Sequence, residues 1–113
     1  MLPEVRKLLF DILEAGKDIE AFVQALDYGQ YLADRMVQSA VERKFEIIGE
    51  ALNRLKYRDD EVLAAIPEHS RIIGFRNVIS HGYDTIEPEL VWDAVQNHLP
   101  ALRGVVEGLL GDS

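Results

Sequence analysis

Residues 36–55, MVQSAVERKFEIIGEALNRL, are the stretch of this sequence that decides the fold. Apolar residues recur in it at steps of three and four, which is the period of an α-helix. They are Met36, Val37, Ala40, Val41, Phe45, Ile47, Ile48, Ala51, Leu52 and Leu55. Because they cover so much of the helix circumference, more than one neighbour must pack on them. The stretch therefore predicts a central helix of a bundle, or a helix that faces a second subunit.

Helical periodicity continues towards both ends of the chain. Before the central stretch, apolar spacing predicts one long amphipathic helix over about residues 3–25, followed by a break around Asp27 to Gly29. After it, Asp59 or Asp60 can cap a short turn that leads to Pro67. These two breaks delimit the central helix.

Two more helices are expected in the second half of the chain. The third runs from near Ser70 to His81, where Gly82 is placed to end it. The fourth opens at Pro88, and Pro100 predicts a kink within it. No segment alternates with period two and no linker is long. We therefore predict a single all-α domain, residues 1–113, with four main helices in an up-and-down bundle plus a short helix.

The composition narrows the possible functions of the protein. The 113 residues (12.8 kDa) include no cysteine, which excludes a disulfide scaffold, thiolate catalysis and thiolate zinc sites. No run of eighteen apolar residues occurs, so we expect neither a membrane span nor a signal peptide, and a cytoplasmic location by default. A net charge of −8 argues against nucleic-acid binding through overall charge.

The charge is distributed unevenly along the chain. Residues 1–34 carry −4 and residues 77–113 carry −5, whereas residues 35–76 carry +1. An anionic partner is therefore expected to bind the middle of the chain if it binds anywhere. The alternative is a set of solvated helix faces whose imbalance is incidental.

The residues best suited to chemistry gather at the end of the predicted third helix, in Arg76-Asn77-Val78-Ile79-Ser80-His81-Gly82-Tyr83. Asn77 and His81 are four residues apart and share one helix face, where the amide can hold the imidazole or a phosphate oxygen. Arg76 and His81 lie about 140° apart around an ideal helix, so they converge only through long side chains, fraying or a second copy of the chain. In a plainer alternative, His81 caps the helix and Arg76 forms a surface ion pair.

Four stretches give the whole chain a resemblance to the HepT-like branch of the HEPN superfamily. They are Asp11-Ile12-Leu13-Glu14-Ala15; Ala40-Val41-Glu42-Arg43 running into Ile47-Ile48-Gly49-Glu50-Ala51; Ile73 to Tyr83; and Val91-Trp92 leading to Leu99-Pro100. The third stretch holds the family's signature of Arg, four residues, His, one residue and Tyr, here Arg76, His81 and Tyr83. The chain has Phe75 where the family usually has methionine, and Asp84 where it has an aromatic residue.

The resemblance implies a HEPN-like helical fold and a toxin of a two-gene toxin–antitoxin pair. Such a toxin acts as a metal-independent endoribonuclease in a homodimer, without a cofactor. Its usual partner is a small nucleotidyltransferase, which neutralises the toxin by transferring AMP from ATP to the motif tyrosine, here Tyr83. The expected partners are therefore an RNA substrate, a nucleotidyltransferase antitoxin and a second copy of the chain.

The side chains of the motif suit RNA cleavage by the RNA's own 2′-hydroxyl. That reaction needs a group to take a proton, a group to give one, and a cation for the phosphate oxygens. His81 can exchange protons near neutral pH, and Arg76 can hold phosphate through two parallel hydrogen bonds. Two chains would bring an acid and a base into one cleft between their third helices. Asn77 is expected to position phosphate or imidazole, and Glu50 to orient Arg76.

Several of these residues also have a plainer, non-catalytic interpretation. Tyr83 can be a half-buried packing residue, and Glu50 a polar residue at the edge of an exposed helix face. His69 and His98 lack metal-ligand spacing with His81. The basic residues of the second helix can guide RNA, meet the antitoxin or simply be solvated; they are Arg43, Lys44, Arg54, Lys56 and Arg58. The chain as a whole could also be a helical substrate-binding or assembly subunit of a nucleotidyltransferase that cuts no RNA.

Overall fold

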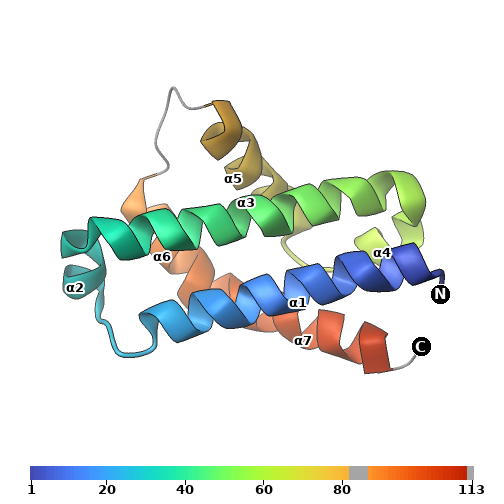
Figure 1. The fold of residues 1–113 in the computed structure, drawn as a ribbon, viewed down its shortest axis with the longest axis horizontal. Helices are drawn as coiled ribbons and strands as arrows, with labels where there is room; N and C mark the ends of the chain where they lie inside the picture. Colours follow the sequence, from blue (N-terminus) through green and yellow to red (C-terminus); the bar gives the residue numbers. More distant parts are fainter. Residues whose placement is uncertain (82–86, 112–113) are drawn as a thin grey trace.

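The computed structural model describes residues 1–81 and 87–111, and for residues 79–81 the backbone alone (Figure 1). The described residues form helices and no β-strand, which confirms the predicted all-α class. The elements are α1 (Pro3–Val23), α2 (Tyr28–Ala33), α3 (Arg35–Arg58), α4 (Asp60–Ala64), α5 (His69–His81), α6 (Pro88–Asp93), the π-helical turn η1 (Ala94–His98) and α7 (Leu99–Gly111).

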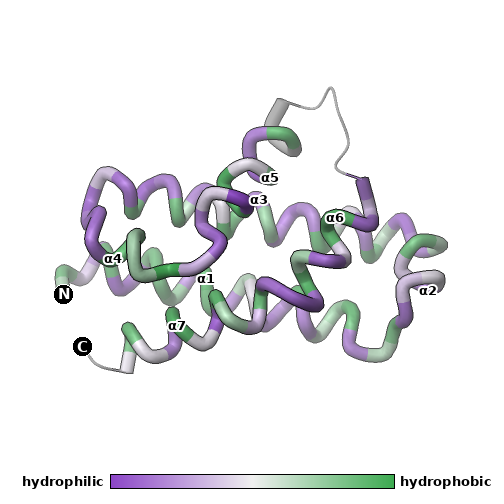
Figure 2. The backbone as a smooth tube through the Cα atoms, turned by 180° about the vertical axis from the view of Figure 1, so that it is seen from behind, coloured by the Kyte–Doolittle hydropathy of each residue, from purple (hydrophilic) through white to green (hydrophobic). Residues whose placement is uncertain are grey.

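The long helices α1 and α3 lie side by side and antiparallel, and α7 packs along α1 (Figures 1 and 2). Helix α5 leaves their common direction and crosses α3 steeply in both views. Helix α3 therefore packs against both α1 and α5, as its wide apolar stripe requires. The largest fully buried side chains are Tyr31, Phe45, Leu9, Ile12, Ile19, Ile48, Leu52, Leu55, Ile66, Ile72, Leu99 and Leu102.

Aspartate side chains cap the starts of three helices. Asp27 begins α2 with a capping box: its carboxylate accepts from the Gln30 backbone N–H at 2.8 Å, and the Gln30 side chain accepts from the Asp27 N–H at 2.9 Å. Asp34 and Asp59 accept from the third residues of α3 and α4. Of the two candidates, Asp59 is therefore the cap of the short helix. Helix α2 begins where the sequence predicts a break, around residues 27–29.

The fourth predicted helix contains a π-helical turn just before Pro100. In η1 the N–H of Leu99 donates to the carbonyl of Ala94, five residues back. Proline has no N–H to donate, and its ring crowds the carbonyl four residues earlier in a regular helix. A wider turn ahead of the ring relieves that crowding. The irregularity expected at Pro100 is thus a π turn over Ala94–His98, after which α7 starts at Leu99.

Hydrophobic and hydrophilic residues are interleaved along the long helices (Figure 2). In α1 the residues that face the core recur at helical spacing, for example Val5, Leu9, Ile12 and Ile19. Over residues 1–81 and 87–111, we find no helix with both the length and the apolar character needed to cross a membrane.

Candidate functional site

Arg76 lies where α5 comes closest to α3, and Gly49 of α3 makes this approach possible. A β-carbon added at Gly49 would overlap the Cβ of Arg76 and lie 2.9 Å from the carbonyl oxygen of Ile72. Real β-carbons essentially never lie that close to backbone atoms, so only glycine fits at this crossing. Gly49 was not singled out as a site residue, because its spacing in the sequence carries no sign of the helix that crosses it.

Apolar contacts hold α5 on α3 around this crossing. Ile72 is fully buried, and the ring of Phe75 meets the buried ring of Phe45 edge to face, with ring centroids 5.6 Å apart. Phe75, the departure from the family pattern, is therefore a packing residue between the two helices. These contacts fix the stem of the neighbouring Arg76 relative to α3.

The Arg76 guanidinium is held by two polar side chains. Its Nη2 lies 2.6 Å from the Glu50 carboxylate, and its Nη1 donates to the Asn77 side-chain oxygen at 3.0 Å. Glu50 also accepts from Nε of Arg54 at 3.2 Å. Two guanidiniums thus share one carboxylate, which leaves a net charge of +1 on the trio. The structure brings together three of the sequence-derived candidates, Arg76, Asn77 and Glu50.

The two arginines keep Glu50 ionised. Partial burial by itself would raise the pKa of the Glu50 carboxyl. Hydrogen bonds from Arg54 and Arg76, together with their positive charges, outweigh it and lower the pKa below the ordinary value of 4.5. The carboxylate therefore stays charged at neutral pH, as a residue that orients a guanidinium must.

Replacing Glu50 with glutamine should destabilise the protein at neutral pH, and the deficit should vanish in acid. Because folding lowers this pKa, the stabilisation is complete above pH 4.5 and is lost as the pH falls through the folded-state value. Urea unfolding of both proteins at pH 7 and at several points below pH 4.5 measures the difference. Glu14→Gln, on an exposed part of α1 outside the site, controls for the lost charge. A difference that stays constant with pH would contradict this account.

The Arg76 side chain borders an open cleft of about 320 Å³ between α1 and α3. Its lining combines three apolar residues with six charged ones: Leu8, Ile47 and Ala51, and Asp11, Arg43, Glu46, Glu50, Arg54 and Arg76. The Asp11 carboxylate pairs with Lys7 and that of Glu46 with Arg43. Each acid of the lining therefore has a basic neighbour, and the surplus positive charge lies at Arg54 and Arg76.

The structure describes less of the other two signature residues, His81 and Tyr83. His81 is the last residue of α5, one helical turn beyond Asn77 on the same face, and its side chain is outside the description. Tyr83, the expected AMP acceptor, lies outside the described residues, as do Gly82 and Asp84. Of the three signature residues, the structure therefore gives side-chain contacts for Arg76.

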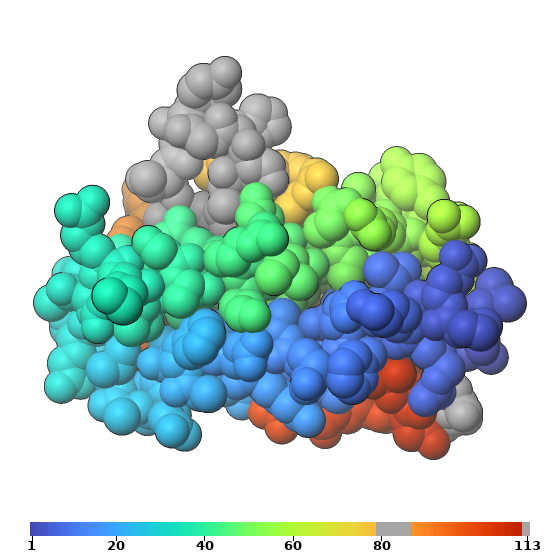
Figure 3. All heavy atoms as spheres, in the orientation of Figure 1, coloured from blue at the N-terminus to red at the C-terminus, as the bar shows by residue number. Residues whose placement is uncertain are grey.

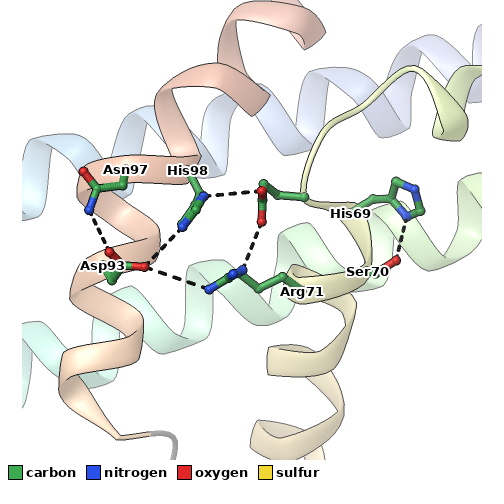
Figure 4. Close-up of polar contacts among 7 residues, drawn as sticks. His69, Ser70, Arg71, Asp93, Asn97 and His98 are labelled. Carbon is green, nitrogen blue, oxygen red and sulfur yellow. Dashed lines mark hydrogen bonds and ion pairs between the residues drawn. The ribbon is translucent and has the colours of Figure 1, made fainter.

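A second polar cluster ties the start of α5 to η1 (Figure 4). The His98 ring lies between two carboxylates, 3.4 Å from Glu68 and 3.1 Å from Asp93. Arg71 reaches the same two carboxylates, at 3.0 and 3.9 Å. A hydrogen bond from Asn97, aided by the one with His98 and by the charge of Arg71, lowers the pKa of Asp93. His98 is thus part of a polar network that joins α5 to η1.

This network anchors the base of the helix that carries the motif. Glu68, the residue before α5, has a backbone φ of 65°, a value that costs a non-glycine residue free energy. Its contacts to Arg71 and His98 hold it there. His69, the next residue, lies beside Ser70 and turns away from the network. Over residues 1–81 and 87–111, no three acidic or histidine side chains are grouped as a metal site would require.

The fold and this site define a class: a small all-helical protein in which two crossing helices hold an arginine at the edge of a cleft. Residues 12–109 match the family described as Ribonuclease HepT-like. The chain belongs to this HepT-like ribonuclease family of the HEPN superfamily, which confirms the resemblance carried by its motifs. The enzyme class expected from the sequence, a ribonuclease, is that of the family.

Individual relatives resemble the chain along nearly its full length. It is 33% identical over 104 residues to the "Putative RNase MJ1380" of Methanocaldococcus jannaschii, covering 92% of this chain and 94% of the relative. It is also 33% identical over 103 residues to the "Probable ribonuclease HepT" of Thermococcus cleftensis, covering 89% and 91%. No solved structure matches the chain.

Proposed function

We propose that this protein is the toxin of a toxin–antitoxin pair and cuts RNA as a metal-independent endoribonuclease. Two chains form the enzyme, with their α5 helices facing one cleft. Arg76 binds the phosphate, His81 transfers protons, and Asn77 and Glu50 position them. The cytoplasm is the compartment in which such an enzyme meets its substrate.

The observation that carries this proposal is the way Arg76 is held. Glu50 and Asn77 fix the guanidinium from two sides, yet an arginine has five N–H donors, and these contacts use only some of them. The second arginine on Glu50 restores the positive charge that the ion pair would cancel. A rigid, cationic group with donors to spare suits the crowded oxygens of a phosphate in a transition state.

The reaction needs acid–base groups and a cation. The His81 imidazole of one chain takes the proton of the RNA 2′-hydroxyl, whose oxygen forms a bond to the adjacent phosphorus. The bond from phosphorus to the 5′-oxygen breaks, and the imidazolium of the second chain gives that oxygen a proton. The products are a 2′,3′-cyclic phosphate and a free 5′-hydroxyl. Since each chain has one motif histidine, the homodimer completes the site.

The antitoxin is a nucleotidyltransferase that transfers AMP from ATP to Tyr83 and releases pyrophosphate. The tyrosine oxygen forms a bond to the α-phosphorus, and the tyrosine loses its proton. The added group carries a negative phosphate and an adenosine next to Arg76 and His81, so it occupies the anion site and blocks RNA. The motif spacing and the family membership support this part of the proposal.

Producing the protein without its antitoxin should arrest growth, and His81→Ala should remove the arrest. The purified wild type should cut RNA in the presence of a metal chelator and leave cyclic phosphate ends, because no step uses a metal. Growth assays and mass analysis of the RNA ends are the measurements. His69→Ala is a matched control that should keep the arrest, since His69 lies beside Ser70 and turns away from the network that anchors α5. Harmless overproduction together with no cleavage of any tested RNA would favour the non-catalytic subunit.

Incubation with the partner nucleotidyltransferase and ATP should add AMP to the protein and stop RNA cleavage. Tyr83→Phe should accept no AMP, because the acceptor oxygen is gone, and should stay active in the presence of the partner. Intact-mass measurement and a cleavage assay read the two effects. Tyr57→Phe removes a hydroxyl elsewhere and should still be modified. A Tyr83→Phe protein that gains the AMP mass would contradict the assignment.

A further inference from the structure

A large aromatic side chain is exposed to solvent near the C-terminal end of α3, beyond the residues that line the cleft. Tyr57 is 76% exposed, although it sits near the end of the helix that supplies most of the core contacts. Its neighbours in sequence are both basic, and Nζ of Lys56 lies 5.9 Å from the centre of the ring. Nothing in the proposed reaction uses this residue.

Tyr57 shares its helix face with the site. Glu50, Arg54 and Tyr57 follow one another at steps of four and three residues, so their side chains lie on one side of α3. Arg54 lines the cleft and bonds Glu50, which holds Arg76. Tyr57 is seven residues after Glu50, a rise of roughly 10 Å along the helix. An unpaired RNA strand covers that distance in a few nucleotides.

The second half of α3 carries more basic than acidic residues, although the protein as a whole is acidic. Residues 43–58 contain five basic and two acidic residues, a balance of +3 in a chain of −8. Arg54 pairs with Glu50, and Arg58 with Glu4 at 3.9 Å across to α1. The side chains of both arginines are well exposed, and exposed ion pairs exchange at little cost for contacts with phosphates. In Figure 3 the light-green surface of the second half of α3 lies beside the blue surface of α1.

We propose that Tyr57 is a stacking platform for an unpaired base of the RNA substrate, a few nucleotides from the phosphate at Arg76. Arg54 binds the phosphates of the intervening strand, and Arg58 binds a phosphate on the far side of Tyr57. Exposed rings flanked by cations bind single strands in this way, because every base has a flat face and every linkage a charge. The inference rests on the proposed ribonuclease function and extends its site into a track along α3 that selects single-stranded RNA.

Binding is measured with His81→Ala protein, which leaves the RNA uncut, and a fluorescently labelled single-stranded RNA of ten nucleotides and mixed sequence. Adding Tyr57→Ala should weaken binding about tenfold, whereas Tyr57→Phe should keep the affinity, since stacking needs the ring. Met36→Ala removes a side chain that is 82% exposed at the other end of α3 and should have no effect. Thermal unfolding verifies that each variant folds. Equal affinities for the Ala and Phe variants would overturn the proposal.

Cleavage separates this inference from the proposed function. Tyr57→Ala should raise KM for the ten-nucleotide RNA about tenfold and leave kcat unchanged, and should leave cleavage of a dinucleotide unchanged. A single abasic nucleotide is placed at each position of the substrate in turn. At one position it should raise the KM of wild type, and at that position it should not raise the KM of Tyr57→Ala further. If wild type cuts RNA but no position is sensitive, the platform is wrong and the nuclease stands. If wild type cuts neither substrate, the proposed nuclease function is wrong. In that case the binding measurement tests the stacking role of Tyr57, and an unchanged affinity of Tyr57→Ala for RNA would reject it.

Discussion

Replacing Arg76 with alanine is expected to lower kcat for RNA cleavage by about 100- to 1,000-fold, the effect of deleting one fixed donor to the charge that develops in a transition state. Arg76→Lys should recover only part of this rate, because a single ammonium cannot make two parallel hydrogen bonds. The measurement is the initial rate of cleavage of a defined RNA at saturating concentration.

Arg71→Ala provides the matched control for that experiment. Arg71 lies on the same helix, five residues earlier, and also pairs with carboxylates. Its loss should loosen the base of α5 and lower stability, with a far smaller effect on kcat. Equal losses of kcat in the two variants would show that the placement of α5, rather than the Arg76 guanidinium, determines the rate.

Replacing Gly49 with alanine should have the second large effect, on both stability and rate. The added methyl group overlaps Arg76 and the backbone of Ile72, so α5 must move away from α3. Overpacking of this kind typically costs about 1–3 kcal/mol of the free energy of unfolding. A shift of about 1 Å in a catalytic group can cost about 100-fold in rate. Denaturant unfolding and the cleavage assay measure the two losses.

Gly108→Ala is the control for this substitution. Among the residues that the structure describes, none outside the adjoining helix backbone lies within 4 Å of a β-carbon added at Gly108, which is inside α7. Alanine there should stabilise the protein by roughly 0.5–1 kcal/mol, because glycine loses more backbone entropy on folding. Unchanged stability and activity in Gly49→Ala would refute the close approach of the two helices.

Much of the fold could be predicted because its helices are amphipathic. The spacing of apolar residues in 3–25 and 36–55 is a local property, and it places the two antiparallel helices that make up most of the core. Helix α2 was missed although Asp27 and Gln30 form a capping-box pair, because six residues show too little periodicity to reveal a helix. The steep crossing of α5 could not be predicted, since it depends on contacts far apart in sequence.

Some residues of the candidate site could likewise be predicted from the sequence, and others could not. Spacing on α5 predicts that Asn77 faces His81 or a phosphate oxygen, and it does not predict the contact with Arg76, because adjacent residues on a helix point about 100° apart. Glu50 was reached through the resemblance, and the structure supplies its geometry: one carboxylate shared by two arginines. Gly49 could not be found, because a glycine in a helix has no local signature of a neighbouring backbone. The network of Glu68 and His98 joins residues 30 positions apart and was equally invisible.

The π turn before Pro100 constrains how this chain can change in length. A π turn holds one residue more than the regular helix it replaces, and each residue advances an α-helix by about 100°. Deleting one residue from Ala94–His98 would rotate α7 by that angle relative to α6. The face that carries Leu99, Leu102 and Val106 would then turn away from α1. Insertions and deletions should therefore accumulate between helices, while the distance from Trp92 to Leu99 stays constant among functional relatives.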